Sequence, residues 1–275
     1  MPSALDAKRS PSASEPMSST LRCLQVFQAL ADPPYELSLT EIGARLRMVK
    51  GSAHRMVRTL AAAGLVDQDP RTKLYRLSPK AFWAGTAYLR NSPVYRAALP
   101  LLQSIAYESG LVVSLGAWHD RSLLYLNSIT PPGLAHLVAE IGERWPVHST
   151  ALGKAMLAYR SRQEIDALTE VDRPRYTPKT IVSAAGIRQE ARKTRARGYA
   201  VDDEEMIQGV RCVASPIFDS EGAAVAAISI SGPVLALTNE TVEERAALVR
   251  EAATKVSMQL GYRPAARGRT PPAAL

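Results

Sequence analysis

Residues 38–77 read SLTEIGARLRMVKGSAHRMVRTLAAAGLVDQDPRTKLYRL, and this stretch decides the fold of the N-terminal part of the chain. Its first four residues have the Ser-x-x-Glu form of a capping box, which predicts the start of a helix. Over residues 50–63 apolar side chains recur at helical spacing, and Gly64 then ends that helix. Two short apolar runs around a polar turn follow and predict a hairpin. Two helices joined by about four residues and followed by a hairpin predict a winged helix-turn-helix.

Further helices are predicted on both sides of this stretch. Apolar residues recur at helical spacing over residues 18–30, and an Asp-Pro-Pro run ends that helix. Residues 79–91 predict another helix, bounded by Pro93, which we interpret as a linker between two domains.

The pattern changes after the linker, where strands mix with helices. Strand-like apolar runs cover residues 111–118, 123–129, 212–218 and 224–231, and helical patterns cover residues 94–109, 151–159, 184–197 and 239–260. Several strands are joined as hairpins, which favours an α+β domain with an antiparallel sheet. The predicted organisation is a disordered tail at 1–17, a winged helix-turn-helix domain at 18–78, a linker helix at 79–92, an α+β domain at 93–262 and a disordered tail at 263–275.

Composition and charge narrow the class of protein. The 275 residues carry a net charge of +8, and 46% of them are hydrophobic, so a core of ordinary size can form. Residues 1–92 hold 13 Lys and Arg against 7 Asp and Glu, while the remainder holds 21 against 19. This asymmetry predicts that the N-terminal domain meets a polyanion, with nucleic acid as the first candidate. Because no apolar run approaches the ~18 residues of a membrane span and no secretory signal is visible, we expect a soluble, cytoplasmic protein.

The helix at residues 50–63 predicts a DNA-reading surface. If its apolar side chains are buried, its other face carries near its start the residues that would approach bases: Lys50, Ser52, His54 and Arg55. Arg58 lies further along and is expected to hold a phosphate. The hairpin tip adds residues that would grip the DNA backbone or the minor groove: Arg71, Thr72 and Lys73. The alternative is a solvated charged helix face, which the surrounding helix-turn-helix pattern disfavours.

Two segments resemble the isocitrate-lyase-regulator (IclR-type) family of bacterial transcription factors. The first, which resembles the family's recognition helix and wing, comprises SAHRMVRTL at 52–60, GLV at 64–66 and YRL at 75–77. The second falls at every spacing of the family's C-terminal signature, with Gly198, Asp202, Glu205, Cys212-Val213-Ala214 and Ile217-Phe218-Asp219. The stretch HSTALGKA at 148–155 also resembles a segment typical of these regulators, and the similarity covers residues 18–262.

The resemblance implies a winged-helix DNA-binding domain, a linker helix and a GAF-like α+β domain that binds a small effector. It also implies a homodimer, or a tetramer built as a pair of dimers, that reads a pseudo-palindromic operator. Small organic acids, aromatic ones included, are the implied effectors. Carried over by position, the effector pocket consists of Ala151, Leu152, Asp202, Cys212, Ser229 and Ser231. The sequence departs from many relatives near the start of the recognition helix, where it has Val49 and Gly51 instead of Ser or Pro.

The chemistry of these pocket residues suits an organic anion. Ser229 and Ser231 are two apart, so on a strand both hydroxyls point to one face. Ala151 and Leu152 would open a helix, where free N–H groups favour an anion. Asp202 could accept a bond from an effector hydroxyl or could brace its loop, because a carboxylate would repel the anion unless it is protonated or turned away.

The residues leave some alternatives open. A thiol hydrolase could use Cys212 with His148, but nothing positions an orienting carboxylate or an oxyanion hole for that pair. A nonspecific DNA-coating protein fits poorly with a C-terminal part that is nearly balanced in charge. The acidic run at 202–205 is compatible with a metal site or with a solvated loop, and Trp145 with stacking on an aromatic ligand or with packing. Histidines and cysteines lack metal-ligand spacing, so we expect no metal site. We also expect no cofactor and no enzyme activity.

Overall fold

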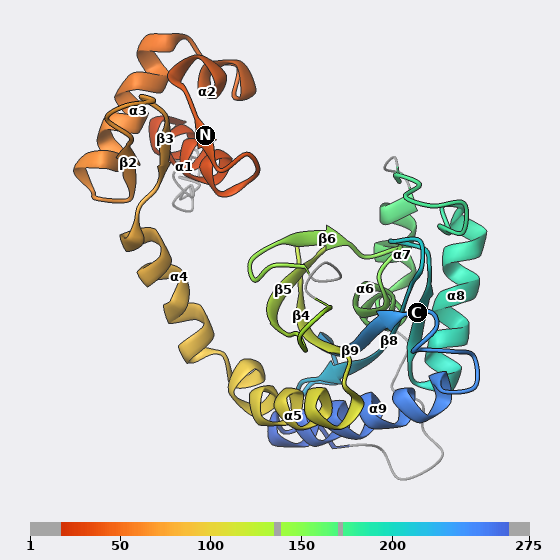
Figure 1. Cartoon of the computed structure of the whole chain (residues 1–275). Coiled ribbons are helices and arrows are strands. Elements are labelled where there is room, and N and C mark those ends of the chain that lie inside the picture. The colour runs from red at the N-terminus through yellow and green to blue at the C-terminus, as the bar shows by residue number, and fades with distance from the viewer. Residues whose placement is uncertain (1–17, 135–138, 170–172, 264–275) are drawn as a thin grey trace, which may run out of the picture. The chain divides into compact units, whose positions relative to one another are not determined.

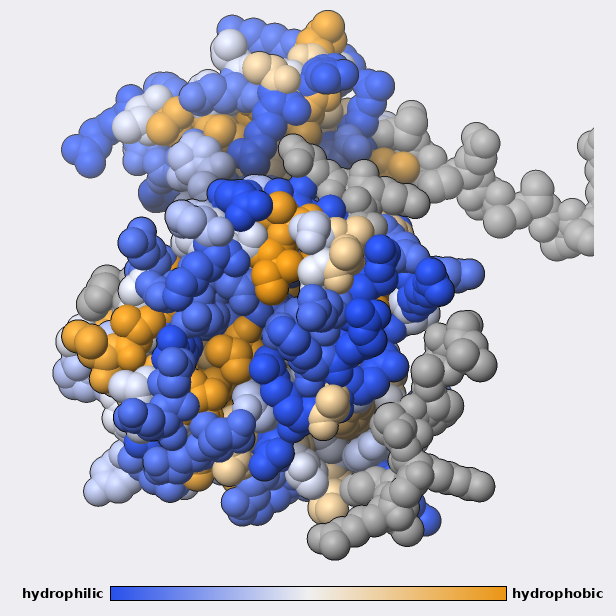
Figure 2. Space-filling model, turned by 90° about the vertical axis from the view of Figure 1, so that its right-hand side faces the viewer, coloured by the Kyte–Doolittle hydropathy of each residue, from blue (hydrophilic) through white to orange (hydrophobic). Residues whose placement is uncertain are grey.

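The computed structural model describes residues 18–134, 139–169 and 173–263 (Figure 1). The chain divides into two compact units, Met1–Tyr88 and Leu89–Leu275, and the division falls inside one helix. Hydrophilic residues cover most of the face drawn in Figure 2, and apolar surface is confined to smaller areas between them. None of the described helices is both long and apolar enough to cross a membrane.

Three helices and a small sheet form most of the N-terminal unit. The helices are α1 (Ser18–Ala31), α2 (Leu39–Arg45) and α3 (Lys50–Ala62), and the strands are β1 (Glu36–Leu37), β2 (Val66–Gln68) and β3 (Tyr75–Leu77). The strands pair antiparallel in the order β1-β3-β2, so β2 and β3 form the predicted hairpin. The sequence does not predict β1, because two residues are too few to show an alternation. α4 (Pro79–Asn91) follows the sheet and contains the division between the units.

The helix-turn-helix is built as its sequence predicts. The Ser38 amide donates to Glu41 Oε2 at 2.7 Å and the Glu41 amide donates to Ser38 Oγ at 3.2 Å, which together make the capping box of α2. After α3, Gly64 adopts a φ of +73°, which glycine tolerates without strain. The buried face of α3 packs with α1 and α2 around Val26, Leu30, Ile42, Ala53, Val57 and Leu60. Met56 lies at the edge of this core and is only half-buried.

An antiparallel sheet in the order β6-β5-β4-β9-β8-β7 forms the centre of the C-terminal unit (Figure 1). Its strands are β4 (Val112–His119), β5 (Ser122–Ile129), β6 (Arg144–Pro146), β7 (Ala200–Asp203), β8 (Val210–Phe218) and β9 (Ala224–Pro233). The helices are α5 (Pro93–Ser109), α6 (Ala151–Leu157), α7 (Arg162–Thr169), α8 (Ala184–Arg197) and α9 (Val242–Gln259). The chain therefore combines an N-terminal helix-turn-helix with an α+β domain, which confirms the predicted fold class.

The two faces of this sheet carry different side chains. On β8, Val213 packs in the core that contains α5 and α9, whereas its neighbour Ala214 packs in the core that contains α6. On β9, Ile228 and Ala227 divide between the same two cores, because successive strand residues point to opposite faces. The larger residues thus face the two long helices, and the alanines leave room for α6 and for a cavity beside it.

The sequence misses three short elements of this unit. β6 and β7 are the two edge strands of the sheet, and β7 contains Asp202 and Asp203, a residue type that is depleted from strands. Pairing with β8 holds β7 in place despite this composition. α7 has only eight residues, so its periodicity is short. The final helix begins at Val242 rather than at residue 239.

Gly153 makes the packing of α6 possible. A Cβ at this position would lie 2.3 Å from Val147 Cα and 2.6 Å from Val147 O, both backbone atoms that cannot move aside. We expect Gly153→Ala to lower the free energy of unfolding by about 3 kcal/mol or more, because overpacking a rigid site costs this much. Urea unfolding followed by circular dichroism measures the change. In Gly85→Ala the new Cβ meets nothing within 4 Å, so this control should be neutral or stabilising.

Candidate DNA-binding surface and effector pocket

The exposed face of α3 is cationic. Its exposed or half-buried residues include every position that the sequence assigns to DNA contact on this helix, namely Lys50, Ser52, His54, Arg55 and Arg58. Arg55 Nη2 donates to Ser52 Oγ at 3.3 Å, and this contact holds the guanidinium along the helix surface. Within the described ranges, Lys50, Arg55 and Arg58 have no acidic partner. This face can therefore neutralise phosphates or donate to base edges.

The start of α3 tolerates the two unusual residues of this sequence. Val49 is the N-cap and provides no side-chain hydrogen bond, and Gly51 lies in the first turn with open space around it. The amides of Ser52 and Ala53 both donate to Val49 O, so the helix begins regularly. Because no side chain caps this end, the first amides can donate to a phosphate.

The tip of the β2–β3 hairpin is ordered by one carboxylate. Asp69 Oδ1 accepts hydrogen bonds from the amides of Arg71 at 2.8 Å and Thr72 at 2.9 Å, and these bonds hold the pKa of Asp69 below its usual value. Lys73 follows in a left-handed conformation, with a φ of +61°. All three side chains at the tip are exposed. Arg45, at the end of α2, is held by a backbone contact, unlike the side chains of the hairpin tip. Its Nη1 donates to Pro33 O at 3.0 Å and thereby links α2 to the preceding loop.

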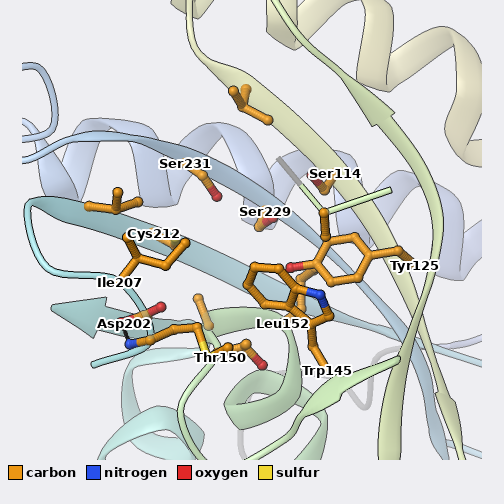
Figure 3. A pocket seen from close by; sticks show the side chains of 15 residues that line it. Ser114, Tyr125, Trp145, Thr150, Leu152, Asp202, Ile207, Cys212, Ser229 and Ser231 are labelled. Carbon is orange, nitrogen blue, oxygen red and sulfur yellow. Dashed lines mark hydrogen bonds between the residues drawn. The ribbon is translucent and has the colours of Figure 1, made fainter. Parts of the chain in front are cut away.

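All six residues that the sequence assigns to the effector pocket line one cavity in the C-terminal unit (Figure 3). Its walls also include residues that the sequence does not single out: Val112, Ser114, Tyr125, Ala139, Thr150, Met206, Ile207 and Val210. Strand register brings the polar residues together, because Asp202 on β7 pairs with Cys212 on β8, and Cys212 pairs with Ser231 on β9. Ser229 on β9 likewise pairs with Ser114 on β4. Ser114 could have been noticed as a lone serine on the same strand face as Val112.

The cavity has a polar side and an aromatic side. In Figure 3 the side chains of Ser231, Ser229 and Ser114 follow one another along one wall, and Tyr125 and Trp145 lie at one end. The rings of Tyr125 and Trp145 meet edge to face with centroids 5.5 Å apart, and Trp145 Nε1 donates to Glu143 Oε2 at 3.1 Å. Trp145 thus packs against Tyr125 and also lines the cavity, so both of its expected roles are compatible with the structure.

The start of α6 forms the floor of the cavity. Thr150 Oγ1 accepts from the Gly153 amide at 3.2 Å and donates to Pro146 O at 2.8 Å. In the described residues, the amides of Ala151 and Leu152 have no hydrogen-bond acceptor, and both residues line the cavity. The volume is about 30 Å³, which is room for roughly two water molecules. We call this small space, bounded by the residues above, the contracted cavity.

Asp202 is buried and braces its own loop. Its Oδ1 accepts from the amides of Glu205 at 2.7 Å and Met206 at 3.3 Å, and the residue is 3% exposed. Burial raises the pKa of Asp202 to about 7, although Lys154 and the two amide bonds act in the opposite direction. The side chain is thus both a loop brace and a wall of the cavity.

The acidic run at 202–205 is neither a solvated loop nor a metal cluster. Glu205 is buried and its Oε1 accepts from Lys154 Nζ in a close ion pair, while Asp203 pairs with Arg211 and Lys179. The structure overturns the solvated-loop interpretation, because Asp202 and Glu205 are buried and the cations of Lys154, Lys179 and Arg211 pair with this run. Over residues 18–134, 139–169 and 173–263, no group of three His, Cys, Asp or Glu could hold a metal ion.

The structure does not support a thiol hydrolase. Burial and Asp202 hold the pKa of the Cys212 thiol well above its usual value, so the reactive thiolate is disfavoured. His148 does not line the cavity of Cys212, and its Nε2 contacts Pro174 O at 3.2 Å. The two residues therefore do not form a nucleophile–base pair.

Comparison with known proteins places the chain in a family. The family described as "Bacterial transcriptional regulator IclR C-terminal" matches residues 86–258, and the "IclR helix-turn-helix domain" matches residues 19–70. The chain belongs to the IclR family of bacterial transcriptional regulators. This IclR-family chain is therefore a DNA-binding regulator with a C-terminal effector domain, and its relatives are transcriptional regulators rather than enzymes.

Similar proteins span nearly the whole regulator. The transcriptional regulator KdgR of Escherichia coli is 34% identical over 247 residues, which cover 90% of this chain and 94% of KdgR. A crystal structure of an IclR transcriptional regulator from Alicyclobacillus acidocaldarius superposes with a TM-score of 0.80 at 28% identity, covering 90% of this chain and 100% of the other. An IclR homologue of Microbacterium hydrocarbonoxydans, crystallised with 4-hydroxybenzoate, shares the fold, with a TM-score of 0.76 at 22% identity over 88% and 99% of the two chains.

Proposed function

We propose that this IclR-family regulator binds a pseudo-palindromic operator and that a small organic acid in the contracted cavity changes its affinity for that operator. The exposed cationic face of α3 is the observation that carries operator binding, because its cations have no acidic partner within the described part of the chain. The proposed DNA contacts are Lys50, Ser52, His54, Arg55 and Arg58 on α3 and Arg71, Thr72 and Lys73 on the hairpin tip. Because bacterial DNA lies in the cytoplasm, we propose that the regulator acts there.

The proposed effector site consists of Ala151, Leu152, Asp202, Cys212, Ser229 and Ser231. The hydroxyls and the two α6 amides are hydrogen-bond donors for a carboxylate, and Tyr125 and Trp145 provide apolar surface for an aromatic body. The 4-hydroxybenzoate bound by the Microbacterium homologue supports aromatic acids as candidates.

The contracted volume supports a link between binding and conformation. An organic acid is larger than the two waters for which the cavity has room, so its binding must separate the walls. A ligand that binds only the opened form shifts the protein towards that form. We propose that opened and contracted forms differ in operator affinity, and a coupling of about 1–3 kcal/mol is enough for control.

We further propose that the regulator acts as a homodimer or as a tetramer made of two dimers. Three large side chains of α4 are strongly exposed, with Phe82 at 76%, Trp83 at 64% and Tyr88 at 56%. Exposed apolar surface of this kind is typical of protein–protein contacts. Two α3 helices in a dimer would then read two half-sites about one helical turn apart or more.

Titration of a fluorescent DNA duplex tests the operator proposal. The duplex carries the DNA upstream of the gene, and fluorescence anisotropy is followed at about 150 mM salt against a scrambled competitor, because phosphate contacts depend on salt. We expect saturable binding that survives the competitor and is altered by organic acids such as 4-hydroxybenzoate. If a selection from random sequences also returns no motif, with and without such acids, the proposal is wrong.

Replacement of Ser229 tests the effector site. Ser229→Ala removes a hydroxyl from the cavity wall and adds no bulk, so we expect operator binding to persist while the affinity for the acid falls about tenfold or more. A hydrogen bond to a charged group contributes about 1.5–3 kcal/mol. Isothermal titration calorimetry measures the affinity. Ser220→Ala makes the same change at an exposed turn serine outside the cavity and should leave the affinity unchanged.

A further inference from the structure

A second and larger cavity opens in the C-terminal unit. Its volume is about 380 Å³, within the range of small-molecule sites. It is lined by Arg121, Pro146, Val147, His148, Leu157, Leu168, Arg173, Pro174 and Ile187. None of these residues lines the contracted cavity of the proposed effector site. Ala151 and Leu152 line the contracted cavity, whereas His148, before α6, and Leu157, at its end, line this second cavity.

Most of the wall is apolar. Val147, Leu157 and Ile187 belong to the protein core, with exposed fractions of 2%, 2% and 4%. They come from the segment after β6, the end of α6 and α8, respectively. Leu168, near the end of α7, and two prolines complete this surface. Because most of the lining side chains are apolar, the wall favours an apolar ligand body.

The charged groups of the wall are cationic. Arg121 lies in the β4–β5 turn, is exposed, and has no ion pair or side-chain hydrogen bond among the residues that the structure describes. Arg173 is held in place, because Nε donates to Val182 O at 2.7 Å and Nη1 to Leu168 O at 3.0 Å. Both of these acceptors are neutral carbonyls, so the charge of Arg173 is not compensated by them. Among the lining residues that the structure describes there is no carboxylate.

His148 adds a polar group without adding charge. It is 6% exposed and its Nε2 contacts Pro174 O. Burial lowers the pKa of His148, and Arg173 and Lys154 act in the same direction, so the imidazole is neutral at physiological pH. A neutral imidazole can donate to or accept from a polar group on the ligand.

We propose that this cavity is a second ligand site, which takes an amphipathic organic anion: one carboxylate or sulfonate facing Arg121 and Arg173, with an apolar or aromatic body against Val147, Leu157, Leu168 and Ile187. An arginine can bind such a group with two parallel hydrogen bonds. The site is separate from operator binding and from the proposed effector pocket.

Fluorescence titration of the full chain with 1-anilinonaphthalene-8-sulfonate tests the site without DNA. This probe joins one sulfonate to an aromatic body. We expect Arg121→Glu to weaken its binding by about tenfold or more, because the favourable charge is reversed. Arg192→Glu reverses an exposed charge on α8 outside the cavity and should change the affinity less than about twofold. Equal weakening by both variants would show a general charge effect and would overturn the proposal.

Two further variants locate the probe. Leu168→Trp places a larger side chain at the half-buried edge of the cavity and should remove the same binding event. Ser231→Leu fills the contracted cavity instead and should leave the event intact. Loss of binding in Ser231→Leu, or none in Leu168→Trp when circular dichroism shows both variants folded, would place the probe elsewhere and overturn the proposal.

An uncharged probe tests the chemical class. N-phenyl-1-naphthylamine has the same aromatic rings without the sulfonate. If the arginines recognise an anion, this probe should bind at least about tenfold more weakly than the sulfonate. Equal affinities would show that the cavity takes apolar molecules in general and would contradict the anionic class. These measurements contain no operator DNA. The second-site proposal can therefore be refuted while operator binding is confirmed, and operator binding can be refuted while the second site is confirmed.

Discussion

Arg55→Ala is expected to lower the affinity for the operator about 5- to 150-fold and to relax the preference for its sequence. Arg55 lies on the exposed face of α3 near the helix start, where it can bond a base edge. Loss of such a contact costs about 1–3 kcal/mol. Fluorescence anisotropy with operator and scrambled duplexes measures both effects.

Arg58→Ala should behave differently from Arg55→Ala. If Arg58 holds a phosphate, its loss weakens binding to operator and scrambled DNA alike and reduces the slope of log affinity against log salt by about one. Arg90→Ala removes an exposed charge at the end of α4 and should have little effect on either duplex. Unchanged operator affinity in the Arg55→Ala Arg58→Ala double variant would refute the proposed DNA-binding surface.

The affinity for an organic acid is expected to fall about tenfold between pH 6 and pH 8, and Asp202→Asn should abolish this dependence. Asp202 borders the contracted cavity, so its ionised form repels a carboxylate there. Its pKa of about 7 means that the neutral fraction falls from about nine-tenths at pH 6 to about one-tenth at pH 8. Calorimetry with 4-hydroxybenzoate in buffers of different ionisation enthalpy measures the affinity and the proton taken up.

Among the described residues, two other ionisable side chains line the cavity, those of Tyr125 and Cys212. Burial holds the pKa values of Tyr125 and Cys212 well above the usual ones, so both stay neutral, and Lys154 and Glu205 form a buried ion pair. The same pKa shift of Asp202 makes the free energy of unfolding depend on pH, because a carboxyl whose pKa is raised by folding binds its proton more tightly in the folded state. Its contribution to stability is therefore lost as the pH rises from about 4 to about 7. Affinity that is flat with pH in the wild-type protein would contradict this role of Asp202.

The DNA-binding half could be predicted almost completely from the sequence. A capping box, the periodicity of α3 and a helix-ending glycine are local signals, since each concerns residues within about one or two helical turns. They predict the helix-turn-helix and also separate the exposed face of α3 from its buried one. The two-residue strand β1 could not be predicted from these local signals. It pairs with β3, which lies 40 positions further along the chain, as in the pair Glu36 and Arg76.

The C-terminal site was predicted in part, through a resemblance and not through local pattern. That resemblance selects six positions that line one cavity, but it misses Ser114, Tyr125 and Thr150, which line it too. The acidic run at 202–205 illustrates how composition alone can mislead about burial. Its composition is that of a solvated loop, whereas the structure buries Asp202 and Glu205 beside Lys154. No pattern within the run predicts a cation that lies about fifty residues away on α6.

The sequence by itself therefore determined the fold class, the helix-turn-helix and the charged face of α3, because helix periodicity, capping and charge are properties of neighbouring residues. Only the tertiary structure decided which side chains share the contracted cavity, how the pKa of Asp202 is shifted, and that a second cavity with two arginines exists. These properties depend on strand register and on burial, and both arise from contacts between residues that are far apart in the chain.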